Sequence, residues 1–310
     1  MKAKKLMAGF TLFAFAALLG ACSPDNAGES SASSTEATTS AAESSEATET
    51  STEATPGVVL KDGTYNLEEE NYNNGYRVTF SIVVKDGKIV ESNYDNVNEA
   101  GKSKVEDEEY NKKMEEVAKN SPEKYIPALN ESLLSTQDPE AMDVVTGATH
   151  SFHSFQNYAQ QLIQAAQAGN TETIKIDNGA DLKDGTYTIE QKNYSNGYRV
   201  AFSIVVKDGK VAESHYDNVN EAGESKTKDA EYNKMMKDKA GISPEEFIPA
   251  FNEALVAQMN SEEAAPGNVE VVSGATHSFH TFVLYAEQLI NAAEKGDTTP
   301  IEVDNFVEAN

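Results

Sequence analysis

The sequence is poor in cysteine and in positive charge. Its 310 residues include one cysteine, Cys22, and 25 lysines and arginines against 51 aspartates and glutamates, which gives a formal net charge of −26. A single cysteine excludes a disulfide within the chain, even in an oxidising compartment. The negative charge excludes nucleic acid as a partner, and it excludes an electrostatic attachment to anionic lipid. Acidity of this kind is ordinary for a secreted protein and indicates no particular chemistry.

The sequence begins with an apolar stretch that is too short to remain in a bilayer as a spanning helix. The stretch runs from Met7 to Leu19 and follows three lysines, an arrangement typical of a secretory signal peptide. It ends at Leu19-Gly-Ala-Cys22, which resembles a bacterial lipobox, the motif whose cysteine receives a diacylglycerol. We therefore predict a lipoprotein signal peptide over residues 1–21 and lipidation at Cys22, because two acyl chains suffice for stable anchoring. The alternative is an ordinary signal peptide followed by an unrelated cysteine.

The segment 23–56 has no basic residue and no aromatic residue, and it consists almost entirely of Ser, Thr, Ala and Glu. Such a segment cannot bury enough apolar surface to offset the conformational entropy lost on ordering, so we predict that it is disordered. Together with the lipidated cysteine it forms a predicted tether over residues 22–57, between the membrane and the folded part of the chain.

The rest of the chain is an internal duplication. Lys61-Asp-Gly-Thr-Tyr65 returns 122 residues later as Lys183-Asp-Gly-Thr-Tyr187, and further along the second copy gains five residues. A period of this length indicates two complete domains rather than a solenoid of short repeats. We therefore predict two homologous domains of ordinary size, over residues 58–174 and 175–310.

Each copy has the residue pattern of a mixed α+β domain. β-branched and aromatic residues on both sides of an Asp-Gly turn predict a hairpin. Apolar residues at helical spacing predict three helices, the second of which has Ser121 as its N-cap and Pro122 in its first turn. In the first copy the predicted strands cover residues 64–69, 76–84 and 89–94, and the predicted helices cover residues 106–119, 122–136 and 150–168.

A seven-residue motif precedes the last predicted helix of each copy. It reads Asp143-Val-Val-Thr-Gly-Ala-Thr149 in the first copy and Glu270-Val-Val-Ser-Gly-Ala-Thr276 in the second. We interpret it as a strand end, a glycine-containing turn and a hydroxyl residue at a helix N-terminus, where free N–H groups and the helix dipole favour a phosphate. The small residues beside the threonine let a bulky group approach its hydroxyl. Because an unactivated threonine is a poor nucleophile, a modification there requires a separate enzyme.

The motif resembles the flavinylation signal of FMN-binding domains, which occur in Na⁺-translocating NADH:quinone reductases and in Rnf complexes. In that family a flavin transferase cleaves FAD and joins FMN through a phosphoester to the last threonine of the motif. The resemblance implies two covalent FMN groups in this chain, one on Thr149 and one on Thr276. Glu270 departs from the aspartate of the family pattern, so we expect Thr276 to be the poorer substrate. The other motif positions that the resemblance assigns to the flavin sites are Asp143, Thr146, Gly147, Ala148, Ser273, Gly274 and Ala275.

Over essentially its whole length, the chain resembles the lipoproteins of flavin-based extracellular electron transfer in Gram-positive bacteria, also known as peptide-pheromone-encoding lipoproteins. The segment Tyr94-Asp-Asn-Val-Asn-Glu99 and its copy from Tyr216 are typical of that group. The resemblance implies a protein anchored by lipid on the outer face of the cell membrane. It also implies electrons that arrive from the membrane quinol pool and leave to acceptors such as ferric iron. Such a protein is an electron carrier rather than an enzyme with a turnover of its own.

Other interpretations are open at this point. The chain could be a ligand-binding lipoprotein without a redox role, or mainly the precursor of a pheromone released from its signal peptide. The Gly-Ala-Thr segment could merely cap a helix. Three-residue spacing would place His150 with His153, and His277 with His280, on one helix face, as in metal sites. No acid or cysteine completes a ligand set there, so we predict no metal site.

Six tyrosines in or near the predicted strands are candidates for contact with a flavin. Their rings could stack on an isoalloxazine ring or meet its edge. The alternative is that they fill the hydrophobic core or cover its rim. They are Tyr72, Tyr76 and Tyr94 in the first copy, and Tyr194, Tyr198 and Tyr216 in the second.

Overall fold

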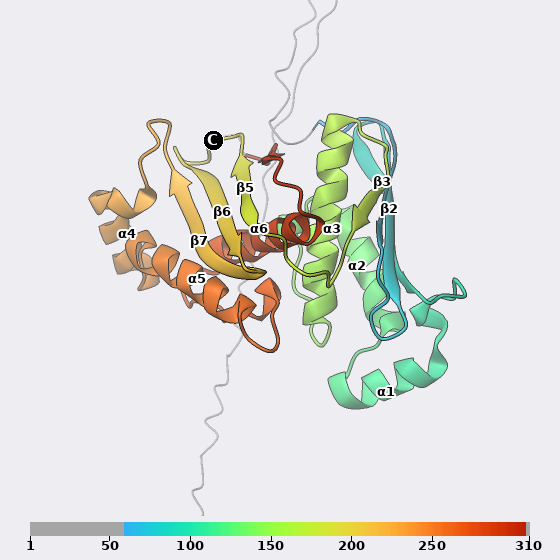
Figure 1. Ribbon diagram of the computed structural model, residues 1–310. Helices are drawn as coiled ribbons and strands as arrows, with labels where there is room; N and C mark the ends of the chain where they lie inside the picture. The colour runs from blue at the N-terminus through green and yellow to red at the C-terminus, as the bar shows by residue number, and fades with distance from the viewer. Residues whose placement is uncertain (1–58, 308–310) are drawn as a thin grey trace, which may run out of the picture. The chain divides into compact units, whose positions relative to one another are not determined.

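The computed structural model describes residues 59–307 (Figure 1). The predicted signal peptide, the lipidation site Cys22 and the predicted tether lie outside the described residues. Residues 59–307 form two similar sets of strands and helices, and both sets belong to one compact unit of the chain. We call residues 59–178 repeat 1 and residues 179–307 repeat 2. Across both repeats, no helix combines the length and the apolar character needed to cross a bilayer.

A four-stranded sheet forms one layer of repeat 1. Its strands are β1 (Gly63–Glu69), β2 (Arg77–Lys85), β3 (Lys88–Val97) and β4 (Ile174–Ile176). They lie in the order β3-β2-β1-β4; the first three are antiparallel, whereas β4 pairs parallel with β1. Alternate residues of β2 are buried, so one face of the sheet lies in the core. The predicted Asp-Gly turn joins β2 to β3, and both of its residues have positive φ.

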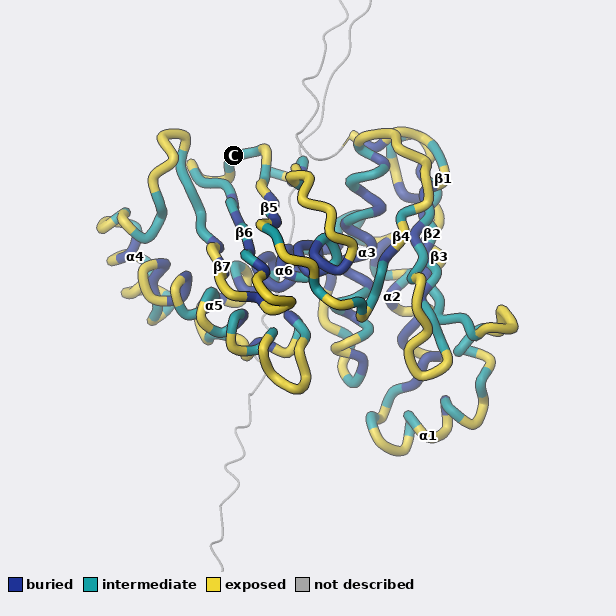
Figure 2. Tube along the Cα trace, in the orientation of Figure 1, coloured by how far each residue is buried: buried dark blue, intermediate teal, exposed yellow. Residues whose placement is uncertain are grey.

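Two long helices cover the buried face of this sheet. α2 (Pro122–Thr136) lies against β3, and α3 (Thr149–Ala168) lies against β1 and β2. Phe155 of α3 packs on Phe80 and Tyr94, with ring centroids 4.8 and 5.1 Å away. Buried residues run along much of α3, as Figure 2 shows. The shorter elements are η1 (Lys104–Glu106), α1 (Glu108–Ala118) and η2 (Pro139–Ala141).

Repeat 2 has the same architecture. Its strands are β5 (Gly185–Gln191), β6 (Arg199–Lys207), β7 (Lys210–Val219) and β8 (Ile301–Val303). They lie in the order β7-β6-β5-β8, again with one parallel edge pair. The helical elements are η3 (Lys226–Lys228), α4 (Ala230–Ala240), α5 (Pro244–Met259), η4 (Pro266–Asn268) and α6 (Thr276–Lys295). Each repeat therefore has its own sheet and its own hydrophobic core.

The structure confirms the mixed α+β fold and the predicted strands and helices of repeat 1, but β4 and β8 were not predicted. The domain boundary predicted after residue 174 falls inside β4, which completes the first sheet. Beyond this strand, Asn71 and Asn178 exchange hydrogen bonds through their side chains and backbones. Repeat 1 therefore extends to Asn178.

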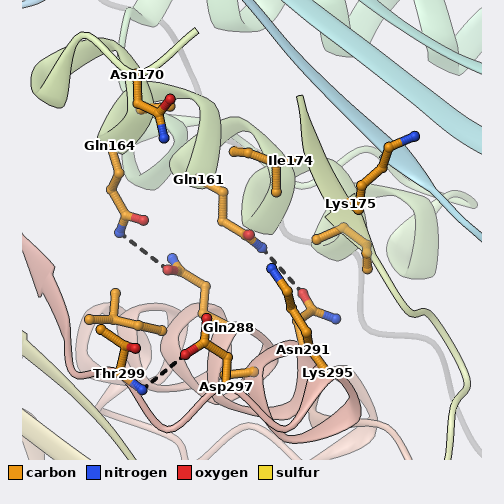
Figure 3. Close-up of a pocket in the computed structure, with 14 residues that line it drawn as sticks. Gln161, Gln164, Asn170, Ile174, Lys175, Gln288, Asn291, Lys295, Asp297 and Thr299 are labelled. Carbon is orange, nitrogen blue, oxygen red and sulfur yellow. Dashed lines mark hydrogen bonds between the residues drawn. The ribbon is translucent and has the colours of Figure 1, made fainter. Parts of the chain in front are cut away.

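The two repeats meet along a polar seam between α3 and α6, which lie against each other. Gln161 donates a hydrogen bond to Asn291, and Gln164 donates one to Gln288, each 3.2 Å long. In the duplication Gln161 corresponds to Gln288 and Gln164 to Asn291, so a pseudo-twofold axis relates the two contacts. Figure 3 shows these side chains around a cavity of about 240 Å³.

Candidate functional site

The motif of repeat 1 is the irregular segment that connects η2 to α3. Asp143, Val144 and Val145 have no regular structure, so the predicted strand end is wrong. Although valine favours strands, Val144 is 43% exposed, and a strand here would gain little from burial. The turn itself is closed by a 3.0 Å hydrogen bond from the N–H of Ala148 to the carbonyl of Val145.

Glycine is required in the motif turn for two reasons. Gly147 has a φ of +78°, in the region that residues with a side chain rarely adopt. In addition, a Cβ on Gly147 would lie 2.6 Å from the carbonyl oxygen of Ala118, the last residue of α1. Gly274 repeats both features, with a φ of +87° and a Cβ position 2.5 Å from the carbonyl oxygen of Ala240. Each motif turn therefore packs directly on the C-terminal end of the preceding short helix.

The two threonines lie at the first positions of α3 and α6, and both are exposed. The N-cap residues are Ala148 and Ala275, whose side chains accept no hydrogen bond, and neither first turn contains an acidic residue. The first N–H groups and the positive end of the helix dipole therefore face no carboxylate of their own helix. This is the arrangement that binds a phosphate. Of the other motif residues, Asp143, Thr146, Glu270 and Ser273 are exposed.

Two residues beside the motif of repeat 1 were not predicted from the sequence. Asn120 donates a hydrogen bond from Nδ2 to the carbonyl of Thr146, 2.8 Å away. Burial raises the pKa of the Tyr125 hydroxyl on α2, and the nearby hydroxyl of Ser151 in the first turn of α3 opposes that rise. Comparison of the two copies carries a signal for both residues, because repeat 2 has isoleucine and phenylalanine at the corresponding positions.

Tyr94 and Tyr216 lie in the two hydrophobic cores. Only 3% of Tyr94 and 2% of Tyr216 is exposed. Each ring meets the phenylalanine of the neighbouring strand edge to face, with centroids 5.3 Å apart. This burial favours core packing over a flavin contact for both residues.

The other four candidate tyrosines lie nearer the surface and have polar partners. Tyr76 donates to Asp107 (2.7 Å), and Tyr198 donates to Asp229 (2.9 Å). The hydrogen bond to Asp107 is the main reason that the pKa of Tyr76 is raised to about 12. The guanidinium groups of two arginines lie over the remaining two rings; these pairs are Arg77 with Tyr72 and Arg199 with Tyr194. The structure brings none of the six tyrosines into hydrogen-bond contact with a motif threonine.

Comparisons with known proteins give the family. A sequence profile of the FMN-binding domain matches residues 74–164. The chain is also 34% identical over 116 residues to the 15 kDa lipoprotein of Treponema pallidum. This similarity covers 37% of the chain and 82% of that protein. The chain belongs to the FMN-binding domain family.

Two solved structures are similar to part of this FMN-binding domain protein. The first is a crystal structure of a protein from Clostridium perfringens, which is 38% identical in sequence and has a TM-score of 0.37. The match covers 38% of this chain and 98% of the Clostridium perfringens chain. The second is a solution structure of a protein from Clostridium thermocellum, which is 23% identical in sequence and has a TM-score of 0.24. The match covers 35% of this chain and 93% of the Clostridium thermocellum chain. Each of these similarities covers little more than a third of the chain.

The segment that matches the FMN-binding domain contains the whole motif of repeat 1, including Thr149, and ends inside α3. Repeat 2 is related to this segment by the internal duplication. Asn120 and Tyr125 also lie inside the matched segment, beside the motif.

The histidines that follow the threonines are neutral at pH 7 where they are buried. Burial lowers the pKa of His153 to about 4, and the charges of His280 and His150 lower it further. Burial and the charge of His277 lower the pKa of His280 as well. Within residues 59–307, histidine, cysteine and acidic side chains form no group of three or more that could hold a metal ion.

Proposed function

We propose that this chain is a lipid-anchored extracellular flavoprotein with two tandem FMN-binding domains. It carries one FMN on Thr149 and one on Thr276, and it relays electrons from the membrane quinol pool to extracellular acceptors such as ferric iron. In this proposal the protein belongs to the Gram-positive type of extracellular electron-transfer lipoprotein.

One observation carries the proposal: the same attachment geometry occurs twice. In both repeats an exposed threonine begins a long helix without a side-chain N-cap, directly after a turn that only glycine can form. A helix-capping role would place a hydroxyl at the N-cap, but alanine occupies that position in both repeats. The geometry therefore favours a modified threonine over a capping residue.

The residues of each site fit a flavin phosphate. Thr149 offers its hydroxyl for a phosphoester, and the first N–H groups of α3 would donate hydrogen bonds to the phosphate oxygens. Bound FMN would supply chemistry that links a two-electron donor to one-electron acceptors. The chain fixes the position of the flavin and retains it, because a covalent bond prevents loss by diffusion outside the cell.

Anchoring at Cys22 rests on the lipobox resemblance and on the similarity to a protein named as a 15 kDa lipoprotein. With a lipid at Cys22, residues 23–56 would act as a tether that lets the flavins move between a membrane donor and an outer acceptor. The strongly acidic composition gives no electrostatic hold on anionic lipid, so the lipid itself must supply the membrane attachment.

The full chain, expressed with and without a flavin transferase, tests the proposal. With the transferase, the intact mass should rise by two FMN groups less two waters, and the yellow colour should survive denaturation. Without it, the mass should equal that of the apoprotein. The flavinylated chain, reduced by dithionite without oxygen, should recover its yellow colour when a ferric chelate is added. A colourless chain from the host with the transferase would refute the cofactor, and reduced flavin that no ferric chelate reoxidises would refute the relay.

A further inference from the structure

Each motif turn packs on the loop that follows the short helix of its repeat, α1 in repeat 1 and α4 in repeat 2. These two corresponding loops differ in sequence. In repeat 1, Lys119 caps α1 and Asn120 follows; in repeat 2, Gly241 caps α4 and Ile242 follows. The Cβ of Asn120 lies 3.1 Å from the point where a Cβ on Gly147 would lie. The Cγ2 of Ile242 lies 3.0 Å from the corresponding point in repeat 2. Both side chains therefore occupy the same place against the turn.

Asn120 holds the turn of repeat 1 by hydrogen bonds. Its Nδ2 donates to the carbonyl of Thr146 at 2.8 Å, and its Oδ1 accepts from the N–H of Ser121 at 2.9 Å. The amide therefore ties the residue before the motif glycine to the start of α2. Ile242 has no donor for the carbonyl of Ser273, and it is partly buried against the core of repeat 2.

This difference bears on how firmly each turn is oriented. Hydrogen bonds are directional, whereas apolar packing constrains orientation less. The motif turn of repeat 1 is therefore held in orientation more firmly than that of repeat 2. In the first turn of the next helix it is repeat 2 that has a hydrogen bond, from the hydroxyl of Tyr216 to the carbonyl of Ser278 at 3.5 Å, so the difference in favour of repeat 1 is confined to the turn.

We propose that Asn120 is a positioning residue for flavin attachment at Thr149, and that Ile242 in its place makes Thr276 the slower acceptor. The inference rests on the proposed function. In the attachment, Oγ1 of Thr149 forms a bond to the FMN phosphorus of FAD, the bond from that phosphorus to AMP breaks, and the hydroxyl proton passes to a base of the transferase. A turn held by Asn120 presents Oγ1 in one orientation, so less freedom is lost in reaching the reactive geometry.

Flavinylation of the full chain with limiting transferase tests this role, because both threonines are read in the same molecule. Peptide mass spectrometry gives the initial rate at each site, and Thr149 should lead in the wild-type chain. Asn120→Ile should slow Thr149 by about threefold to tenfold, the worth of one hydrogen bond, and leave Thr276 unchanged. Ile242→Asn should speed Thr276. Lys119→Gly is the matched control: it gives repeat 1 the glycine that repeat 2 has at Gly241, next to Ile242, and it should change neither rate.

Two further experiments separate the effect of Asn120 on the flavinylation rates from other causes of the difference between Thr149 and Thr276. Glu270→Asp tests the length of the motif acid, and under this proposal it changes the ratio of the two rates less than Ile242→Asn does. Amide hydrogen exchange of the unmodified chain tests the turn without any flavin: Asn120→Ile should speed exchange at Gly147 and Ala148. Unchanged exchange there, or an unchanged ratio of rates in Asn120→Ile, would overturn the positioning role. A wild-type chain that accepts no flavin at either threonine would refute the proposed function instead, and the exchange arm would still decide the role of Asn120 in the turn.

Discussion

A chain in which Thr149 and Thr276 are both replaced by alanine should retain no flavin after denaturation. The loss should be complete, because no other exposed hydroxyl in either repeat stands at the start of a long helix behind the glycine turn. The free energy of unfolding should change by less than about 0.5 kcal/mol. Both side chains are exposed, and the helices already begin without a side-chain cap. Flavin absorbance in urea measures the first result, and urea unfolding of the apoprotein measures the second.

The single variants make this test sharper. Thr149→Ala and Thr276→Ala should each leave one flavin per chain, and the remaining flavin should map to the intact motif. Thr171→Ala, at an exposed threonine outside both motifs, is the matched control and should leave two. Flavin that stays bound to the denatured double variant would show that the attachment lies elsewhere.

The sequence predicted those elements whose signals are local. The predicted helix at residues 122–136 agrees with the observed α2, because Ser121 and Pro122 mark its start. The Asp-Gly pair likewise marks the hairpin turn. In contrast, β4 has only three residues and exists because Ile174 and Ile176 pair with β1, more than 100 residues earlier. Long-range pairing of so short a segment leaves no periodic pattern to read.

Part of the geometry of the candidate site was predictable from the sequence. The duplicated motif singled out Thr149 and Thr276 as candidates, and Gly147 and Gly274 have the positive φ that the predicted turns require. The tyrosines carried no such signal: Tyr94 lies inside the core, whereas Tyr76 is bonded to Asp107 at its rim. The contact of Asn120 with the motif joins two loops, and no sequence pattern within either loop announces it.

The seam between the repeats contains two carboxyl groups without a basic partner. Glu140 of η2 accepts hydrogen bonds from Thr281 (3.0 Å) and Tyr285 (3.4 Å) on α6. Glu287 of α6 faces Asn157 of α3. Neither carboxyl forms an ion pair within the described residues. Burial takes both carboxyls partly out of water, so the charged form is disfavoured.

Burial raises the pKa of Glu140 to about 7, with the nearby charge of Asp138 as the next cause. Burial also raises the pKa of Glu287 to about 8. Both values lie above the ordinary glutamate value of 4.5. Between pH 4.5 and 8 the folded chain therefore holds protons that the unfolded chain has released. These two carboxyls therefore make a contribution to the free energy of unfolding that falls as the pH rises through this window. The lowered pKa values of His153 and His280 contribute in the opposite sense below about pH 6.5.

Glu287→Gln should remove the part of this fall that Glu287 causes. A glutamine keeps the shape and the hydrogen bonding of the protonated acid and cannot ionise. At pH 4 the variant and the wild-type chain should unfold with equal free energies, because Glu287 is protonated in both states there. At pH 9 the variant should be more stable by about 2 kcal/mol, less than the full shift in pKa would give, because Glu287 is only half-buried. Urea unfolding followed by circular dichroism at pH 4, 6 and 9 measures the difference.

Two more variants assign the effect to the seam. Glu140→Gln should behave in the same way, with a smaller gain that is complete by about pH 8, because its pKa lies lower. Glu262→Gln replaces an exposed acid of repeat 2, so its effect should be small and should not grow with pH. A Glu287→Gln chain that is no more stable than the wild type at pH 9 would mean that water or local movement already solvates the carboxylate.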